Sequence, residues 1–272
     1  MGPMMVTAAV ASVVMVALII LIRHRIRRRT RYRELAASRA AIVAKHPICV
    51  AAEHPERYAT EFEQQRLVRV AHFVKPESLE AMKQEALANL HRVERTYIPT
   101  HKKGGTVSYE AISCYAPHCL SFYHSPEVQR WISCIVGVTV YPTPERDQSS
   151  LSLLCYTEPG DHINWHYDHN FYKGRHFTVL LPLVNQGPDG GCSRSQLEYK
   201  VGQQVQVCDT SPNSLVVFEG ARVLHRATPT QDGDLRIMLS MTYCSDPRNS
   251  WWKEFIRRVK DTAFFGIRAL WD

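Results

Sequence analysis

The segment richest in chemistry-bearing side chains is HINWHYDHNF, residues 162–171, which holds three histidines and an aspartate within eight positions. In an extended segment, residues i and i+2 point to the same side, so His166 and Asp168 project together. His162 and His169 have no carboxylate two positions further on. The spacing therefore predicts that His166 and Asp168 act as a pair of metal ligands, and that His162 and His169 are polar loop residues.

A third ligand must come from another strand, because two ligands do not hold a reactive metal ion. His225 is the only histidine after residue 176, and it lies in the strand-like run RVLHRAT. Two histidines and one carboxylate on one face leave three positions of a six-coordinate ferrous ion open. The same ligand set also serves zinc hydrolases, so both metals are candidates on these three residues.

Arg236 favours the iron enzyme. It follows His225 by eleven positions and lies inside the apolar run LRIMLSMTYC. Strand alternation places Arg236 on one face with Met238 and Ser240, which would bury its guanidinium in the mouth of a barrel. A buried arginine nearly always meets a planar anion, and a simple hydrolase has less use for one.

With these residues in place, the sequence resembles the Fe(II)- and 2-oxoglutarate-dependent oxygenases, and most of all their prolyl-hydroxylase-like branch. The matching pieces are Tyr156, the His166-Tyr167-Asp168 motif, Thr178 in HFTVLLPLVN, the Gly190-Gly191 turn and the segment NSLVVFEGARVLHRATPTQDGDLRIMLSMTY. Together they cover about residues 150–244. The order and spacing of these pieces are specific, whereas a lone His-x-Asp would be weak.

The resemblance implies roles for six residues. His166, Asp168 and His225 are the implied catalytic iron ligands, and Arg236 is the implied partner of the distal carboxylate of 2-oxoglutarate. Two hydroxyls, those of Tyr156 and Thr178, are implied to complete the cosubstrate pocket, although a strand tyrosine or threonine is just as often an ordinary core residue.

The interval between the distal histidine and Arg236 is slightly longer than in many members of the family. A bulge that shifts the register would leave Arg222, Arg226 or Arg248 as the partner of the cosubstrate. Arg226 is the weakest of these, since it faces opposite to its neighbour His225.

The activity implied by the resemblance is that of a hydroxylase that uses Fe(II), 2-oxoglutarate and O2, with ascorbate as a further candidate, and releases succinate and CO2. Its expected substrate is a C–H bond of a small molecule, a lipid or a protein side chain. Halogenating relatives replace the carboxylate ligand by a small residue that admits chloride, so Asp168 disfavours halogenation. Two other classes stay open: a non-catalytic sensor or scaffold at the membrane, and a cupin-like zinc or iron enzyme without 2-oxoglutarate.

The pattern of residue types along the sequence predicts the elements that position these residues. From Leu151 onward, short β-branched and aromatic runs alternate with turn signals such as GPDGG and QDGD. This pattern predicts a mainly β fold with flanking helices, a double-stranded β-helix or jelly-roll barrel. The oxygenase domain is placed at 56–272 with its barrel core at about 150–244. Residues 76–94 and 249–270 are predicted to form helices, the second packed against the sheet.

The chain begins with a segment that predicts a membrane anchor. Residues 4–22 form an uncharged apolar run of 19 residues, close to the roughly 20 that span a bilayer. Seven arginines follow at 23–33, an order that disfavours a cleaved signal peptide. We therefore expect a transmembrane helix in a single-pass membrane protein, with residues 1–33 as anchor and basic flank, 34–55 as connector, and the catalytic domain on the cytoplasmic side. A buried core helix with a basic arm is the alternative.

The charge balance gives no reason to expect a nucleic-acid partner. The chain has 33 Lys+Arg and 26 Asp+Glu, and the first 33 residues hold seven arginines and no acidic residue. The rest of the chain is therefore formally neutral, and the basic character belongs to the flank of the predicted anchor. Eight cysteines without a Cys-x-x-Cys pair predict free thiols.

Overall fold

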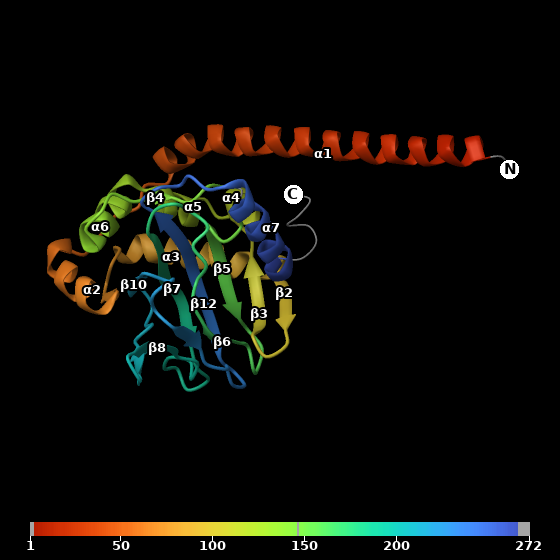
Figure 1. The fold of residues 1–272 in the computed structure, drawn as a ribbon. Coiled ribbons are helices and arrows are strands. Elements are labelled where there is room, and N and C mark those ends of the chain that lie inside the picture. Colours follow the sequence, from red (N-terminus) through yellow and green to blue (C-terminus); the bar gives the residue numbers. More distant parts are fainter. Residues whose placement is uncertain (1–2, 146, 266–272) are drawn as a thin grey trace.

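Twelve strands form one antiparallel sheet at the centre of the protein in the computed structural model, which describes residues 3–145 and 147–265 (Figure 1). In spatial order the strands run β1-β10-β7-β12-β5-β3-β6-β11-β8-β9, with β2 on β3 and β4 on β12. Their bounds are β1 Leu67–Val70, β2 Glu94–Ile98, β3 Lys102–Val107, β4 Tyr141–Pro142, β5 Leu151–Tyr156, β6 His162–His166, β7 His176–Gln186, β8 Leu197–Val201, β9 Gln204–Cys208, β10 Leu215–Phe218, β11 His225–Ala227 and β12 Leu235–Cys244. The sheet forms a nearly closed barrel with flanking helices, so the predicted mainly β jelly-roll core is confirmed.

The helices lie outside the barrel. They are α1 Pro3–Lys45, η1 Pro55–Tyr58, α2 Ala59–Gln65, α3 Pro76–Ala88, η2 Leu90–Arg92, α4 Tyr109–Tyr115, α5 Pro117–His124, α6 Pro126–Val136 and α7 Trp251–Phe265. Local sequence sets several of their ends: Pro76 occupies the first turn of α3, and the Ser125 hydroxyl accepts the Val128 N–H at the start of α6. Gly137, with φ of 71°, ends α6 in the left-handed conformation that glycine adopts without strain.

The strand β12 shows how alternation divides the core. Four of its side chains, Ile237, Leu239, Met241 and Tyr243, belong to the large apolar cluster shared with the helices. The residues between them, Arg236, Met238, Ser240 and Thr242, line the interior of the barrel instead. One face of the strand therefore stabilises the fold by burial of apolar surface, which leaves the other face free to carry polar groups.

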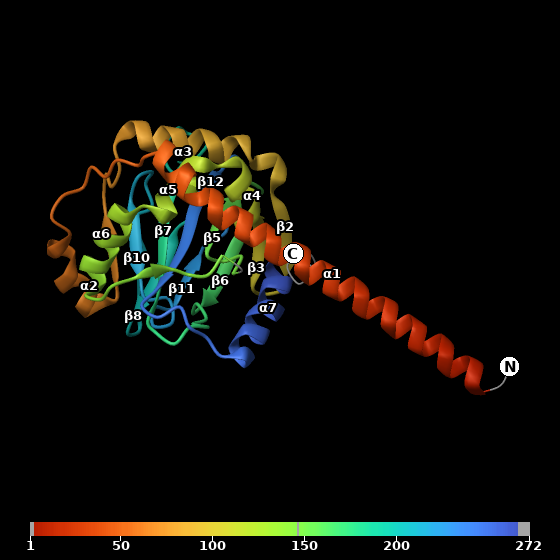
Figure 2. The ribbon, with the colours of Figure 1, turned by 90° about the horizontal axis from the view of Figure 1, so that it is seen from above.

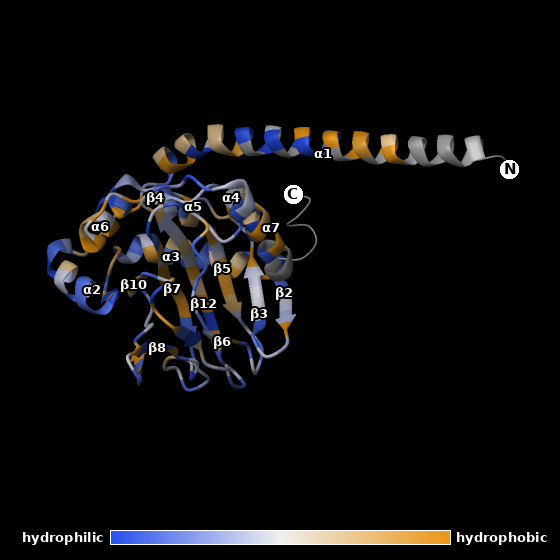
Figure 3. Cartoon of the chain, viewed as in Figure 1, coloured by the Kyte–Doolittle hydropathy of each residue, from blue (hydrophilic) through white to orange (hydrophobic). Residues whose placement is uncertain are grey.

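The helix α1 overturns the predicted membrane anchor. It is a single helix of 43 residues that passes from the apolar run at 4–22 through the seven arginines to Lys45, and Figure 3 shows orange giving way to blue along it. Within the described part of the chain, no helix has an apolar stretch long enough to cross a bilayer. The predicted transmembrane helix and the single-pass topology with a cytoplasmic catalytic domain are therefore wrong. The run nearly reaches bilayer length by itself, but it folds as one element with a strongly basic segment.

The C-terminal part of α1 is attached to the domain. The Ser121 hydroxyl donates to the Ile42 carbonyl oxygen at 3.4 Å, and Arg39 forms an ion pair with Glu145. The remainder of the helix projects away from the barrel (Figure 2). The division of the chain into residues 1–33, 34–55 and 56–272 stays a prediction.

The helix α7 lies beside β2 (Figure 1). Some of its charged side chains face inward. Arg257 is buried and pairs with Glu254 at 2.8 Å, and Lys253 donates to the Tyr172 carbonyl oxygen. Its large apolar side chains are exposed instead, namely Trp251, Trp252, Phe255, Ile256 and Val259. The predicted helix at 249–270 extends beyond α7, and its positions 266–270 lie outside the described residues.

Candidate metal centre and cosubstrate pocket

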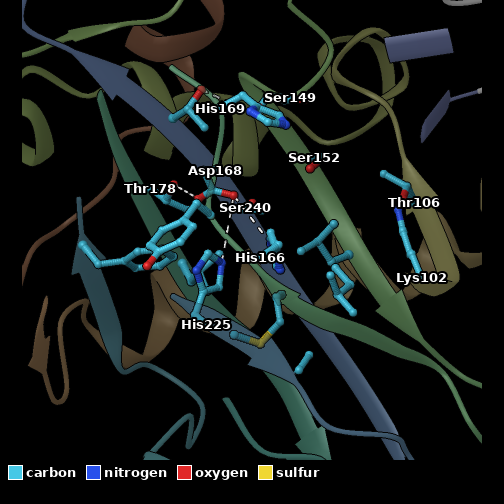
Figure 4. Close-up of a pocket in the computed structure, with 18 of the residues that line it drawn as sticks. Lys102, Thr106, Ser149, Ser152, His166, Asp168, His169, Thr178, His225 and Ser240 are labelled. Carbon is cyan, nitrogen blue, oxygen red and sulfur yellow. Dashed lines mark hydrogen bonds and ion pairs between the residues drawn. The ribbon is translucent and has the colours of Figure 1, made fainter. Parts of the chain in front are cut away.

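A cavity of about 250 Å³ occupies the interior of the barrel. Its wall is formed by residues of β3, of β5 to β8 and of β10 to β12, by the segments before β5 and after β6, and by α7. All the residues singled out from the sequence line it: Tyr156, His166, Asp168, Thr178, His225 and Arg236. Figure 4 shows that the two histidines and Asp168 point toward one another within it.

Strand pairing brings the three predicted metal ligands together. The strands β6 and β11 are antiparallel neighbours, with His166 opposite His225. Asp168 Oδ1 lies 3.6 Å from His166 Nε2 and 3.9 Å from His225 Nε2. One ligand atom from each residue falls within 4.8 Å of the other two, and among the described residues this is the one such cluster of histidine, cysteine and carboxylate groups.

Hydrogen bonds to the backbone fix both imidazoles. His166 Nδ1 donates to the Asn164 carbonyl oxygen at 2.7 Å, and His225 Nδ1 donates to the Val223 carbonyl oxygen at 2.9 Å. Since a carbonyl oxygen only accepts, each ring keeps its proton on Nδ1 and turns the Nε2 lone pair toward the cluster. Burial, and then the neighbouring His225, lower the pKa of His166 to about 4, so its ring is neutral at physiological pH, as a metal ligand must be.

Asp168 is held as a carboxylate. Burial by itself raises its pKa, but His225, His166 and a hydrogen bond together outweigh burial and lower it. That hydrogen bond comes from Thr178, whose hydroxyl donates to Asp168 Oδ2 at 2.5 Å. Thr178 thus hydrogen-bonds a predicted metal ligand, and its contact with the cosubstrate stays a prediction.

Gly220 makes room for this carboxylate. A Cβ atom at Gly220 would lie 2.3 Å from Asp168 Oδ2 and 2.8 Å from Thr178 Oγ1, and the Gly220 carbonyl oxygen accepts the Asp168 N–H at 3.0 Å. Any side chain here would displace Asp168. Gly220 was not predicted from the sequence, because no local pattern marks a glycine whose contact residue is 52 positions away.

Arg236 provides a second polar feature of the cavity. It is 2% exposed, and burial lowers its pKa. Its guanidinium donates to the hydroxyls of Ser195 at 3.4 Å and Thr210 at 3.3 Å, and its buried Nε has no hydrogen-bond partner within the described part of the chain. Among the described residues no carboxylate pairs with it. A buried cation with neutral partners is costly unless an anion completes it, so this end of the cavity fits the carboxylate of a ligand.

Tyr156 lies next to Arg236, on the neighbouring strand. The two residues are opposite each other in the β5–β12 pair, and the guanidinium lies 5.4 Å from the centre of the tyrosine ring. Burial raises the pKa of Tyr156 to about 12, so its hydroxyl keeps its proton and is a donor for an anion in the cavity.

The alternative arginines lie elsewhere. Arg226 pairs with Glu198 at 2.7 Å, Arg222 lies 3.5 Å from Glu219, and Arg248 pairs with Asp246 at 2.6 Å. None of these three arginines lines the cavity. The longer interval before Arg236 therefore does not shift a different arginine into place.

Several polar residues that the sequence analysis did not single out also line the cavity. They are His101, Lys102, Thr106, Asp147, Ser149, Ser152, His176, Thr242 and Lys260. For His176 a local signal existed, because it precedes Thr178 by two positions on β7 and so shares its face. Nothing comparable marked Lys260, which belongs to α7 and reaches the barrel only through tertiary packing.

Two histidines and a carboxylate inside a jelly-roll barrel, beside a buried arginine, are the arrangement of a non-haem iron oxygenase. The family model described as Halogenase D matches residues 50–189, about half of the chain, and the model described as 2OG-Fe(II) oxygenase superfamily matches residues 151–243. The chain belongs to the 2OG-Fe(II) oxygenase superfamily, in the family of the Halogenase D model. It is therefore an Fe(II)/2-oxoglutarate-dependent oxygenase, whose cofactors are Fe(II), 2-oxoglutarate and O2.

Solved structures share the fold at low sequence identity. A prolyl-4-hydroxylase of Pseudomonas putida is 15% identical with a TM-score of 0.54, and the match covers 72% of this chain and 100% of that one. A prolyl hydroxylase of Trichoplax adhaerens, in complex with a hypoxia inducible factor peptide fragment, is 17% identical with a TM-score of 0.56, over 70% and 90% of the chains. The epimerase SnoN from nogalamycin biosynthesis is 13% identical with a TM-score of 0.58, over 70% and 81%. No curated protein sequence matches this chain.

Proposed function

We propose that the protein hydroxylates a C–H bond of its substrate, with His166, Asp168 and His225 as the ligands of Fe(II). The observation that carries this proposal is the convergence of two Nε2 atoms and one carboxylate oxygen within 4.8 Å. Backbone carbonyls hold both rings in the tautomer that binds metal. Such a set leaves three adjacent positions open on a six-coordinate ion.

Arg236 and Tyr156 are proposed to hold the distal carboxylate of 2-oxoglutarate. When bound, Fe(II) with 2-oxoglutarate and O2 supplies the oxidising chemistry and releases succinate and CO2. The task of this chain is to orient the cosubstrate, which Arg236 does through a charge-assisted pair. The buried position of this arginine, 2% exposed, strengthens the pair because water does not screen it.

Halogenation is the second candidate, because the Halogenase D model matches the chain. Asp168 argues against it. The carboxylate is buried, accepts the Thr178 hydroxyl, and fits against a glycine at position 220, so it occupies the position that a halide ligand would need. We therefore expect an oxygenated product in buffer that contains chloride, and mass spectrometry of the product separates the two reactions by the mass added.

The test begins with cofactor binding by the full-length protein. We expect about one Fe(II) per chain, an anaerobic absorption change when 2-oxoglutarate is added, and succinate formation in air. His166→Ala should lose the iron and the absorption change together. Arg236→Leu should keep the iron and need at least tenfold more 2-oxoglutarate. His162→Ala is the matched control, since His162 belongs to the same histidine-rich segment and its ring bonds to the Gly160 carbonyl oxygen, outside the metal cluster.

The same measurements separate the other classes. A sensor binds iron and 2-oxoglutarate and forms no succinate, whereas a scaffold need bind neither. A cupin-like enzyme without 2-oxoglutarate binds the metal and keeps full activity as Arg236→Leu. Wild-type protein that binds no iron, or whose absorption does not respond to 2-oxoglutarate, would overturn the proposed function.

A further inference from the structure

We propose that a second polar compartment of the cavity binds an acidic group of the substrate, a carboxylate or a phosphate, through Lys102, Lys260 and His176. This anion compartment, formed by Lys102, Thr106, Ser149, His176 and Lys260, rests on the proposed function, since it assigns the substrate of that same site. His176 lies away from the pocket around Arg236, because it pairs with Cys244, eight positions along β12 from Arg236, which corresponds to about 26 Å of strand.

Lys102 contributes a buried cation. Lys102 is 3% exposed, and its Nζ donates to the Thr106 hydroxyl at 3.2 Å. Figure 4 shows both side chains on one strand, across the pocket from His166 and Asp168. Burial, and then the nearby Lys260, lower the pKa of Lys102 to about 8. An ammonium group kept in such a place is costly, and such groups concentrate at functional sites.

Lys260 brings a second cation to the same compartment from α7. Its Nζ donates to the Ser149 hydroxyl at 2.7 Å and lies 5.2 Å from the ring of Phe171, and all three residues line the cavity. Elsewhere on this helix, Lys253 donates to the Tyr172 carbonyl oxygen at 3.2 Å, and the side chain of Arg257 is 1% exposed. The position of Lys260 is therefore built into the fold and is not that of a loose surface lysine.

His176 adds a hydrogen-bonding group with no partner in the described protein. It is 5% exposed, lines the cavity, and stacks on the ring of Tyr172 at 6.1 Å. Its Nδ1 is buried without a hydrogen bond, although buried polar groups nearly always have one. Burial lowers the pKa of His176, so the neutral ring carries one N–H that can donate to an oxygen of a bound anion.

The charges at this end favour an anion over a cation or a neutral group. Apart from Asp168, Asp147 is the one carboxylate among the described lining residues. Its oxygens already accept the Tyr172 hydroxyl at 2.6 Å and the Ser149 N–H at 3.0 Å. Among these described lining residues one negative charge therefore accompanies two lysines, and an acidic group bound between the lysines lowers the repulsion of two like charges in a site of low dielectric constant.

The size of the cavity restricts the substrate further. The whole space is about 250 Å³, and the cosubstrate must share it. The part of the substrate that enters is therefore small. We infer a small organic acid or phosphate ester, oriented by its acidic group so that a neighbouring C–H bond faces the metal.

The test measures anion binding apart from turnover. The full-length protein is loaded with Mn(II) and saturating 2-oxoglutarate, and its Tm is followed while propionate or methylphosphonate is added at constant ionic strength. Ligands that bind the native state raise Tm, so a saturable rise is expected for at least one of these acids and none for propionamide. A response to propionate alone identifies a carboxylate, and a response to methylphosphonate alone identifies a phosphate.

Variants connect the response to the compartment. Lys102→Met and Lys260→Met should each raise the Kd of the acid at least tenfold, and His176→Phe at least threefold. Lys103→Met is the matched control, because Lys103 lies on the opposite face of β3 and donates to the Pro159 carbonyl oxygen. Lys260→Met on α7 keeps the test open if Lys102→Met does not fold. No saturable rise with either acid, or lysine variants that bind like the wild type, would overturn the proposal, whereas failure to bind Mn(II) and 2-oxoglutarate would overturn the proposed function instead.

Discussion

At the scale of single residues, the metal site depends on neighbours that hold its ligands more than on the ligands alone. The pleat of an extended segment was enough to select His166 and Asp168 from a cluster of four polar residues, and a lone distal histidine supplied the third member. What the sequence could not reveal is why Asp168 stays ionised in a buried place. That depends on Thr178 and Gly220, which contact it across the barrel.

Thr178→Val is expected to weaken metal binding. Valine keeps the shape of threonine but cannot donate to Asp168 Oδ2, so the pKa of Asp168 rises and more metal-binding free energy is spent on its deprotonation. Loss of such a supporting hydrogen bond costs about 10- to 100-fold in metal affinity. The fold lowers the pKa of Asp168, and the benefit of keeping this group ionised is lost as the pH falls. The loss of metal affinity in Thr178→Val should therefore be larger at pH 5.5 than at pH 7.5.

The measurement is the Kd for Mn(II) by calorimetric titration at both pH values. Thr178→Ser restores the hydroxyl and should restore the affinity. Equal affinities for the valine variant and the wild type at pH 5.5 would contradict a role for this hydrogen bond.

Gly220→Ala is expected to lose the metal while the fold persists. The added methyl carbon would lie 2.3 Å from Asp168 Oδ2, well inside contact distance, so the carboxylate must move. Gly191→Ala is the control, because a Cβ there meets nothing within 4 Å. Iron content after purification, with circular dichroism for the fold, gives the answer, and an alanine variant at position 220 with full iron content would show that Asp168 can adapt.

At the scale of elements, the alternation of side chains along a strand could be predicted from the sequence. The neighbours against which each element packs could not. The run LRIMLSMTYC has the bounds of β12, and its period of two correctly placed Arg236 with Met238 and Ser240 on one face. The helix at Pro76 was likewise visible from spacing and its first-turn proline. The inward charged side of α7 was not, because its apolar residues suggest the opposite orientation and only contacts with distant residues such as Ser149 determine it.

Two neighbouring substitutions on β12 should separate its two faces. Leu239 is fully buried in the cluster shared with the helices, so Leu239→Ala should lower the free energy of unfolding by about 2–5 kcal/mol. Ser240 faces the cavity, and Ser240→Ala should change it by less than about 0.5 kcal/mol. Urea unfolding of both variants measures the difference, and equal costs at the two positions would contradict the assignment of faces.

At the scale of the whole molecule, the N-terminal helix shows the limit of reading a segment alone. A window of 19 uncharged residues meets the length criterion for a membrane span, but α1 continues through seven arginines and ends against the barrel domain, where Arg39 meets Glu145. The hydropathy of a 19-residue window depends neither on the arginines that follow it nor on the contact of the helix with the domain. The barrel, in contrast, was predictable because its strands and turns each carry a local signal that agrees with the global fold.

A buried histidine where α1, α4 and α5 meet predicts how the free energy of unfolding changes at acid pH. His124 lies there, 2.9 Å from the Tyr109 hydroxyl, and burial, with a smaller contribution from Arg39, lowers its pKa to about 3. An unfolded chain titrates its histidines near 6.5, so between these values the unfolded state binds a proton that the folded state does not. Stability contributed by neutral His124 is therefore complete above about pH 6.5 and decreases as the pH falls toward 3.

His124→Gln removes this titration and keeps a hydrogen-bonding side chain beside Tyr109. Its free energy of unfolding should be lower than that of the wild type at pH 7, because a fitted aromatic ring is lost, but it should fall less steeply between pH 6.5 and pH 4.5. Urea unfolding of the metal-free protein at several pH values measures both slopes. Because His124 does not line the cavity that holds the metal ligands, iron content at pH 7 should be unchanged. Parallel slopes for the two proteins would mean that the acid sensitivity comes from other buried groups, with His166 as the first to examine.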